Sequence, residues 1–137
     1  MDMNELPPLQ LITDSGLFVL IWLVQLIIYP SFTYTEKKCF NSWHRKYTGL
    51  MGLIVSPLML TQVGIEVLLL PDEMHRVRIL LIGLVWLATF SLSVPCHHKL
   101  HREGYNDVTI RHLIATNWIR TLLWSFLFLE TVFTVFY

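Results

Sequence analysis

The chain has 137 residues, of which 54% are hydrophobic and only 15% are charged, and its formal net charge is zero. Soluble domains usually carry about 25% charged residues, so this composition argues against a soluble domain, and the neutral balance argues against nucleic acid as a partner. The length predicts a single integral membrane domain over residues 1–137.

Four long apolar runs dominate the sequence and predict helices over about 11–30, 42–70, 74–94 and 107–137. At about 1.5 Å per residue, roughly 20 helical residues cross the 30 Å hydrocarbon core of a bilayer. The runs are too long for membrane strands and lack strict alternation of apolar and polar residues. We therefore expect an all-α fold, a four-transmembrane-helix bundle with up-down-up-down topology.

Proline and cap residues suggest where the first two helices begin and end. The first helix is expected to start near Asp14 or earlier and to end at Tyr29, because the next residue is a proline. The second helix is expected to begin near Asn41 or Ser42, either of which suits an N-cap. Pro57 lies inside the second helix and predicts a kink there.

The third and fourth helices are separated by a polar segment. Pro95 is expected to end or redirect the third helix at Val94, and Pro95–Glu103 then forms a short cytoplasmic helix that stops before Gly104. Asp107 is a suitable N-cap for the fourth helix. These boundaries give the fourth helix about two turns outside the bilayer before its apolar run.

The connections between helices differ in charge, and this difference predicts the orientation. Seven Lys or Arg residues fall in segments 31–47 and 95–112, whereas two fall on the opposite side, at Arg76 and Arg78. Basic loops face the cytoplasm. We therefore expect a multi-pass protein of the plasma (inner) membrane with both termini on the non-cytoplasmic side, and no disulfide between Cys39 and Cys96 in the reducing cytoplasm.

Each predicted helix carries one stripe of polar and aromatic side chains. Such groups are costly in lipid and usually face the interior of a bundle, although interhelical hydrogen bonding alone also explains them. The stripes include Trp22, Gln25 and Tyr29 on helix 1; His44, Gln62 and Glu66 on helix 2; Trp86, Thr89 and Ser93 on helix 3; and Asn117, Arg120, Thr121, Trp124 and Thr131 on helix 4.

Charged residues inside the spans need partners. Arg120 lies near the cytoplasmic end, where it requires a carboxylate, a carbonyl or an anion, or else extends to lipid headgroups. Glu66 lies near the other end of helix 2 and is expected to pair with Arg78. Glu130 is expected at an interface or facing another subunit, and His75 is expected to be isolated.

Five of the six histidines fall on the predicted cytoplasmic side. On a helix, His97 and His101 form an i,i+4 pair, and His44 begins the helix 2 stripe at the same depth. Three imidazoles can bind a metal ion or haem iron, or move protons. The alternative is that they are interfacial residues beside basic neighbours, which we prefer for His98 and His112.

The segments V-P-x-H-x-x-L at 94–100 and N-W-x-R-T-x-x-W at 117–124 resemble the third-to-fourth helix region of small four-helix anthrone-oxygenase-like membrane proteins. The resemblance covers about thirty residues, and His97 stands where that pattern has asparagine. It implies an oxidative enzyme that acts on a flat hydrophobic substrate within the bundle.

Our leading hypothesis is a membrane-embedded oxidoreductase or oxygenase-type protein that acts on a hydrophobic small molecule at the cytoplasmic end of the bundle. The alternative is a non-catalytic accessory subunit that binds other membrane subunits or further copies of the chain. In the first hypothesis the metal or haem ligands are His44, His97 and His101, the catalytic residues are His44, His97, Asn117 and Arg120, and the substrate-binding residues are Trp22, Gln25, Tyr29, Tyr47, Gln62 and Trp124.

Overall fold

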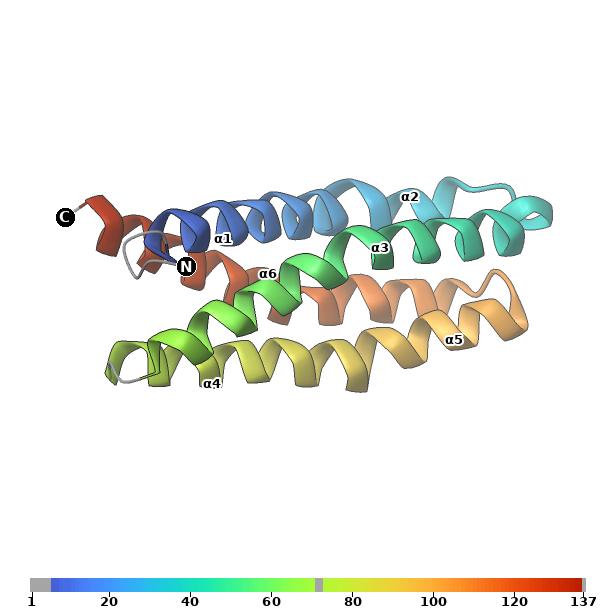
Figure 1. Ribbon diagram of the computed structural model, residues 1–137. Coiled ribbons are helices and arrows are strands. Elements are labelled where there is room, and N and C mark those ends of the chain that lie inside the picture. Colours follow the sequence, from blue (N-terminus) through green and yellow to red (C-terminus); the bar gives the residue numbers. More distant parts are fainter. Residues whose placement is uncertain (1–5, 71–72, 137) are drawn as a thin grey trace.

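The computed structural model describes residues 6–70 and 73–136. Four helical segments in these ranges, Leu6–Tyr34, Lys37–Leu69, Glu73–Glu103 and Asp107–Phe136, are each long and apolar enough to cross a membrane. They lie alongside one another as a bundle (Figure 1). The predicted all-α class and the four apolar helices are thus confirmed.

The first segment comprises α1 (Leu6–Leu23), the π-helical turn η2 (Val24–Ile28), α2 (Tyr29–Ser31) and the 3-10 turn η3 (Phe32–Tyr34). The second segment is α3 (Lys37–Leu69). The third comprises α4 (Glu73–Ala88), the π-helical turn η4 (Thr89–Ser93) and α5 (Val94–Glu103), and the fourth is α6 (Asp107–Phe136).

The bundle has two distinct ends. The start of α1, the end of α3, the start of α4 and the end of α6 lie at one end, which we name the terminal end (Figure 1). The connections from η3 to α3 and from α5 to α6 lie at the other, which we name the loop end. The seven basic residues of segments 31–47 and 95–112 belong to the loop end.

The first helix begins earlier than predicted. It starts at Leu6, with Pro7 and Pro8 in its first turn, where a missing backbone N–H breaks no hydrogen bond. Asp14 is therefore not a cap but a buried residue in the middle of α1. The helix was expected to start near Asp14 or earlier, at about residue 11, and the observed start lies five residues before that position.

Two prolines that were expected to end helices lie inside continuous ones. Pro30 and Pro95 each follow a π-helical turn by two residues, in α2 and α5 respectively. The wider π-turn accommodates a ring that would otherwise clash with the carbonyl four residues earlier. α5 therefore covers almost the range predicted for the short helix, Pro95–Glu103, and ends before Gly104 as expected, but it continues directly from η4 and is not a separate helix.

The remaining boundaries lie close to the predicted ones. α3 starts at Lys37, a few residues before the expected Asn41 or Ser42, and continues through Pro57. α6 starts at Asp107, but its cap is the preceding residue, since the Asn106 side chain accepts a hydrogen bond from the Thr109 backbone N–H at 2.9 Å.

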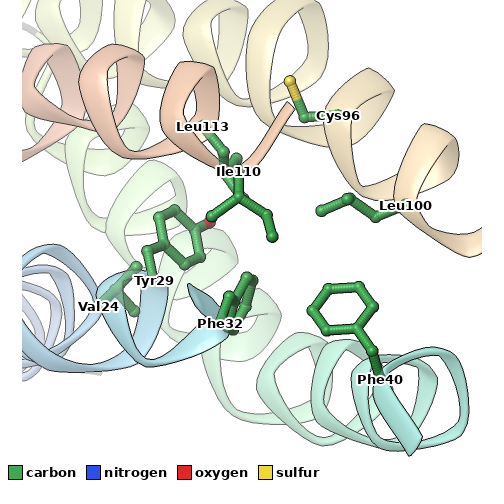
Figure 2. Close-up of a cluster of buried hydrophobic side chains, with 8 residues drawn as sticks. All are labelled: Val24, Tyr29, Phe32, Phe40, Cys96, Leu100, Ile110 and Leu113. Carbon is green, nitrogen blue, oxygen red and sulfur yellow. The ribbon is translucent and has the colours of Figure 1, made fainter. Parts of the chain in front are cut away.

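Two apolar clusters form the interior. The loop-end cluster, drawn in Figure 2, brings side chains from all four segments together around Phe32 and Phe40. The second cluster lies at mid-bundle around Leu17, Ile82 and Trp124. Many other large apolar side chains point outward, as expected where the solvent is lipid. Buried polar side chains gather in two further regions, one at the terminal end and one toward the loop end.

Candidate functional site

The first polar region is an ion-pair network at the terminal end, which we name the charged cluster: Asp14, Glu66, His75, Arg78 and Glu130. Arg78 donates from Nε to Glu66 Oε1 at 2.7 Å and from Nη2 to Asp14 Oδ2 at 2.6 Å, and its Nη1 contacts the Glu130 carboxylate. The predicted Glu66–Arg78 pair is confirmed. The cluster ties α1, α3, α4 and α6 together.

Two predictions about this end were wrong. Glu130 turns inward to Arg78 instead of facing another subunit. His75 is not isolated, because its Nδ1 lies 2.8 Å from Glu66 Oε2. Arg78 is 2% exposed. A buried guanidinium is costly unless it is paired, so carboxylates from neighbouring helices are stabilised in contact with it. The helical stripes alone gave no sign of this convergence.

Gln62 also belongs to the terminal end. Its Nε2 donates to Asp14 Oδ1 at 2.6 Å, and its Oε1 accepts from Trp124 Nε1 at 3.2 Å. The amide is therefore fully engaged beside the charged cluster. The structure does not bring this predicted substrate-binding residue to the histidines.

The second polar region is a hydrogen-bonded chain toward the loop end, which we name the histidine relay: Arg120, Tyr29, His97 and His44. Arg120 Nη2 donates to the Tyr29 hydroxyl at 3.1 Å, which lies 3.1 Å from His97 Nε2. His97 Nδ1 lies 2.9 Å from His44 Nε2. Three of the four predicted catalytic residues thus form one continuous network, and Tyr29 completes it.

The direction of these bonds follows from the donor at its start. Because the Tyr29 oxygen accepts from Arg120, its own proton is free to be donated to His97 Nε2. A neutral His97 then carries its proton on Nδ1 and donates it to His44 Nε2. His44 in turn carries its proton on Nδ1, a buried atom that has no hydrogen-bond partner among the described residues.

Asn117 holds the arginine end of the relay. Its Oδ1 accepts a hydrogen bond from Arg120 Nη2, and its Nδ2 donates to Gln25 Oε1 at 2.8 Å. Thr121 donates to the same Gln25 oxygen at 3.3 Å, and Gln25 donates to the Ile114 carbonyl at 3.2 Å. Asn117 and Gln25 are thus positioning residues behind Arg120.

Arg120 does not extend to the headgroup region. It is 7% exposed, and its hydrogen bonds all go inward, to Tyr29, Asn117 and Thr89. None of these partners is charged, and no carboxylate contacts this guanidinium within residues 6–70 and 73–136. Of the alternatives left by the sequence, the structure supports an interior role.

The two π-helical turns place the relay. Tyr29 follows η2 directly, and Thr89 lies within η4, eight residues, or about two turns, before His97 near the start of α5. A π-turn inserts one extra residue and rotates everything that follows, and such turns often occur at functional sites. Regular helical spacing could not predict this rotation. The one sequence feature associated with it is the proline that follows each π-turn, Pro30 and Pro95.

A cavity of about 460 Å³ adjoins the relay. Its polar wall contains Tyr29, His97 and Arg120, and it is also lined by Tyr47 and Trp124, two residues whose predicted substrate-binding role stays a prediction. Its remaining wall is mostly apolar and includes side chains that are exposed on the bundle surface, such as Leu60 and Phe90. The cavity therefore opens sideways, between α3 and the α4–η4 segment, toward the surrounding lipid.

Several predicted residues do not line this cavity. Trp22 donates from Nε1 to Ser125 Oγ at 3.0 Å and packs edge-on against Trp118. Gln25 and Asn117 lie behind Arg120, and His44 lies behind His97 and is fully buried, stacked against Phe40. A ligand in the cavity would therefore contact the lining residues directly, and not Trp22, Gln25, Asn117 or His44.

His101 is near the relay but outside it. Its ring centroid lies 4.8 Å from that of His44, and its Nε2 lies 3.1 Å from Thr48 Oγ1. It lines a separate, basic surface depression with Arg45 and His98. No group of three or more His, Cys, Asp or Glu residues in the described ranges is arranged to hold a metal ion, so the residues do not fit the predicted metal site, which stays a prediction.

No family model, no curated protein and no solved structure matches this chain. The resemblance to anthrone-oxygenase-like proteins therefore stays a prediction from residues 94–100 and 117–124.

Proposed function

We propose that this protein is a membrane-embedded enzyme that admits a hydrophobic small molecule from the bilayer and acts on its polar group by proton transfer. The observation that carries the proposal is a laterally open apolar cavity whose polar wall is a directed hydrogen-bonded chain. Ligand cavities are typically apolar with a few convergent polar groups, and this one matches that description in size and lining.

In the proposed step, the Tyr29 oxygen takes a proton from the ligand while the hydroxyl proton moves to His97 Nε2. His97 passes its Nδ1 proton to His44 Nε2, so that the ligand loses one proton and His44 gains one. Arg120 stabilises the negative charge that develops on the ligand oxygen. General acid–base transfer of this kind contributes roughly 10²–10⁴-fold in rate.

The oxidoreductase or oxygenase class remains our proposal for the overall reaction, on the strength of the sequence. Such a reaction also needs an electron acceptor, a role that we assign to none of the residues described above. The residues of this chain are proposed to bind the substrate, to orient its oxygen and to carry the proton. The redox class and the proton relay can therefore be tested separately.

The experiment is gentle purification followed by an absorbance spectrum, elemental analysis and mass spectrometry of extracted small molecules. The proposal predicts a bound hydrophobic molecule in near-stoichiometric amount. A Soret band or a stoichiometric metal would support the redox class. Protein that retains no hydrophobic molecule and binds none saturably on reconstitution would contradict the proposed function.

The accessory-subunit alternative loses one of its two supporting features. Glu130 was expected to face a partner, but it contacts Arg78 inside the bundle. The other feature, outward aromatic residues such as Trp118 and Phe126, is equally expected of a lipid-facing helix. We therefore keep the enzyme as the primary proposal.

For the membrane arrangement we propose up-down-up-down topology in the plasma (inner) membrane, with the loop end cytoplasmic and both termini outside. The basic residues at the loop end support this orientation. The surface depression lined by Arg45, Lys99 and Arg102 would there face anionic headgroups.

Thiol labelling tests this orientation. Cys39 is exposed at the loop end and Cys96 is buried. A membrane-impermeant maleimide is expected to leave intact cells unlabelled and to label Cys39 after permeabilisation. As a matched control, Glu73→Cys in a Cys39→Ser background places an exposed thiol at the terminal end, which intact cells should label. The reverse pattern would invert the proposed topology.

A further inference from the structure

Two buried N–H groups beside the cavity have no hydrogen-bond partner in the part of the chain that the structure describes. They are Arg120 Nε and Trp86 Nε1, and both side chains line the cavity. Buried donors in native proteins are almost always paired, and in hydrocarbon no water is available to pair them. Two orphan donors on one cavity therefore indicate a ligand with acceptor atoms at this position.

The two donors come from different helices but lie at the same level. Arg120 Nη1 on α6 donates to Thr89 Oγ1 at 3.5 Å, and Trp86 precedes Thr89 by three residues. Residues three apart on a helix are neighbours on one face. The Trp86 and Arg120 donors thus flank the same part of the cavity wall, next to the Tyr29 end of the relay.

The charge at this position is unbalanced. Arg78 in the charged cluster contacts three carboxylates, whereas the hydrogen-bond partners of Arg120 are Tyr29, Asn117 and Thr89, all neutral. A buried guanidinium in a membrane span is usually paired with a carboxylate, a backbone carbonyl or a bound anion. Within the described residues, Arg120 has the side-chain carbonyl of Asn117 but neither a carboxylate nor a backbone carbonyl. An acceptor that also carries one negative charge would satisfy both requirements.

We propose that the cavity ligand is an apolar carboxylic acid, such as a long-chain fatty acid, which gives its proton to Tyr29 and is then held as the carboxylate, with one oxygen accepting from Arg120 Nε and the other from Trp86 Nε1. A carboxylate supplies two acceptor oxygens and a single negative charge. Its chain would lie along the apolar wall formed by Leu20, Met51, Val55 and Met59. This inference rests on the proposed function, whose ligand class it specifies.

The test is competition binding of tritiated oleate to protein in phosphatidylcholine nanodiscs. Unlabelled oleate is expected to compete at about 10- to 100-fold lower concentration than methyl oleate or oleyl alcohol, which match its chain but lack the charge. Arg120→Gln and Trp86→Phe should each reduce this preference, and the second keeps the ring in place. Arg111→Gln and Trp118→Phe, at exposed positions of α6, are the matched controls and should leave it unchanged.

The outcomes separate the two proposals. If all three competitors displace an apolar probe equally and Arg120→Gln changes nothing, the carboxylate inference fails while the proposed function stands. If no apolar molecule is displaced saturably, the proposed function fails with it. If nanodiscs containing phosphatidylglycerol block oleate binding through Arg120, the anion at this site is a lipid phosphate, and the carboxylate inference is overturned.

Discussion

Arg78→Met is expected to lower the free energy of unfolding by about 3–5 kcal/mol, because it leaves buried carboxylates without their cation. Asp14, Glu66 and Glu130 all contact this guanidinium, and the first two are at most 1% exposed. Unfolding by sodium dodecyl sulfate titration in mixed micelles, followed by circular dichroism, measures the change. Few substitutions in this chain should cost more, since the network joins all four helices.

The matched control for that variant is Arg76→Met, two residues away and exposed, which should change stability by less than about 0.5 kcal/mol. Adding Asp14→Asn and Glu66→Gln to Arg78→Met should restore part of the loss, because neutral amides need no cation. Equal losses for both arginine variants would show that the charged cluster does not hold the bundle.

His97→Ala is expected to lower turnover of the cavity ligand by about 10²–10⁴-fold, since His97 is the middle member of the relay between Tyr29 and His44. Binding of the ligand should change far less, because Arg120 and the apolar wall remain. Turnover is measured in membranes with the molecule extracted from the purified protein.

His112→Ala is the control for the relay. His112 is exposed, as its position off the helix 4 stripe suggested. Its removal should leave turnover within about twofold of the original, since substitutions at exposed positions away from a site have small effects. His44→Gln removes the final proton acceptor, and its turnover should lie between those of His97→Ala and His112→Ala. Full turnover in His97→Ala would refute the proton relay while leaving the binding site intact.

The helices could be predicted from the sequence because the bilayer imposes a simple requirement, about 20 apolar residues in a row. The grouping of Tyr29, His44, His97, Asn117 and Arg120 was also predictable, since ionisable groups in lipid must face one another. The stripes could not predict the change in direction of the side chains that follow a π-helical turn. Each π-turn shifts the following residues by one position, which brings Tyr29 and His97 into contact.

The charged cluster shows the second limit. Glu66 and Arg78 lie at the same depth, which predicts their pairing, but Asp14 was expected only near the start of the first helix, and no partner was predicted for its carboxylate. Its carboxylate instead accepts from Gln62, Arg78 and Thr131 in the bundle interior. Depth along the helix is recoverable from sequence, whereas the partner of a buried charge depends on how the helices pack.

The central claim is that a hydrophobic molecule occupies the cavity between α3 and the α4–η4 segment, and filling that cavity tests it most directly. Gly52 and Gly49 both lie on α3 with open space where a side chain would begin, but only Gly52 is among the residues that line the cavity. Saturable binding of tritiated oleate to Gly52→Phe and Gly49→Phe protein of equal stability is the measurement. The account predicts loss of at least about tenfold in affinity for Gly52→Phe, of the order expected when a well-packed ligand is displaced, and little change for Gly49→Phe. Unchanged binding in both variants would contradict it.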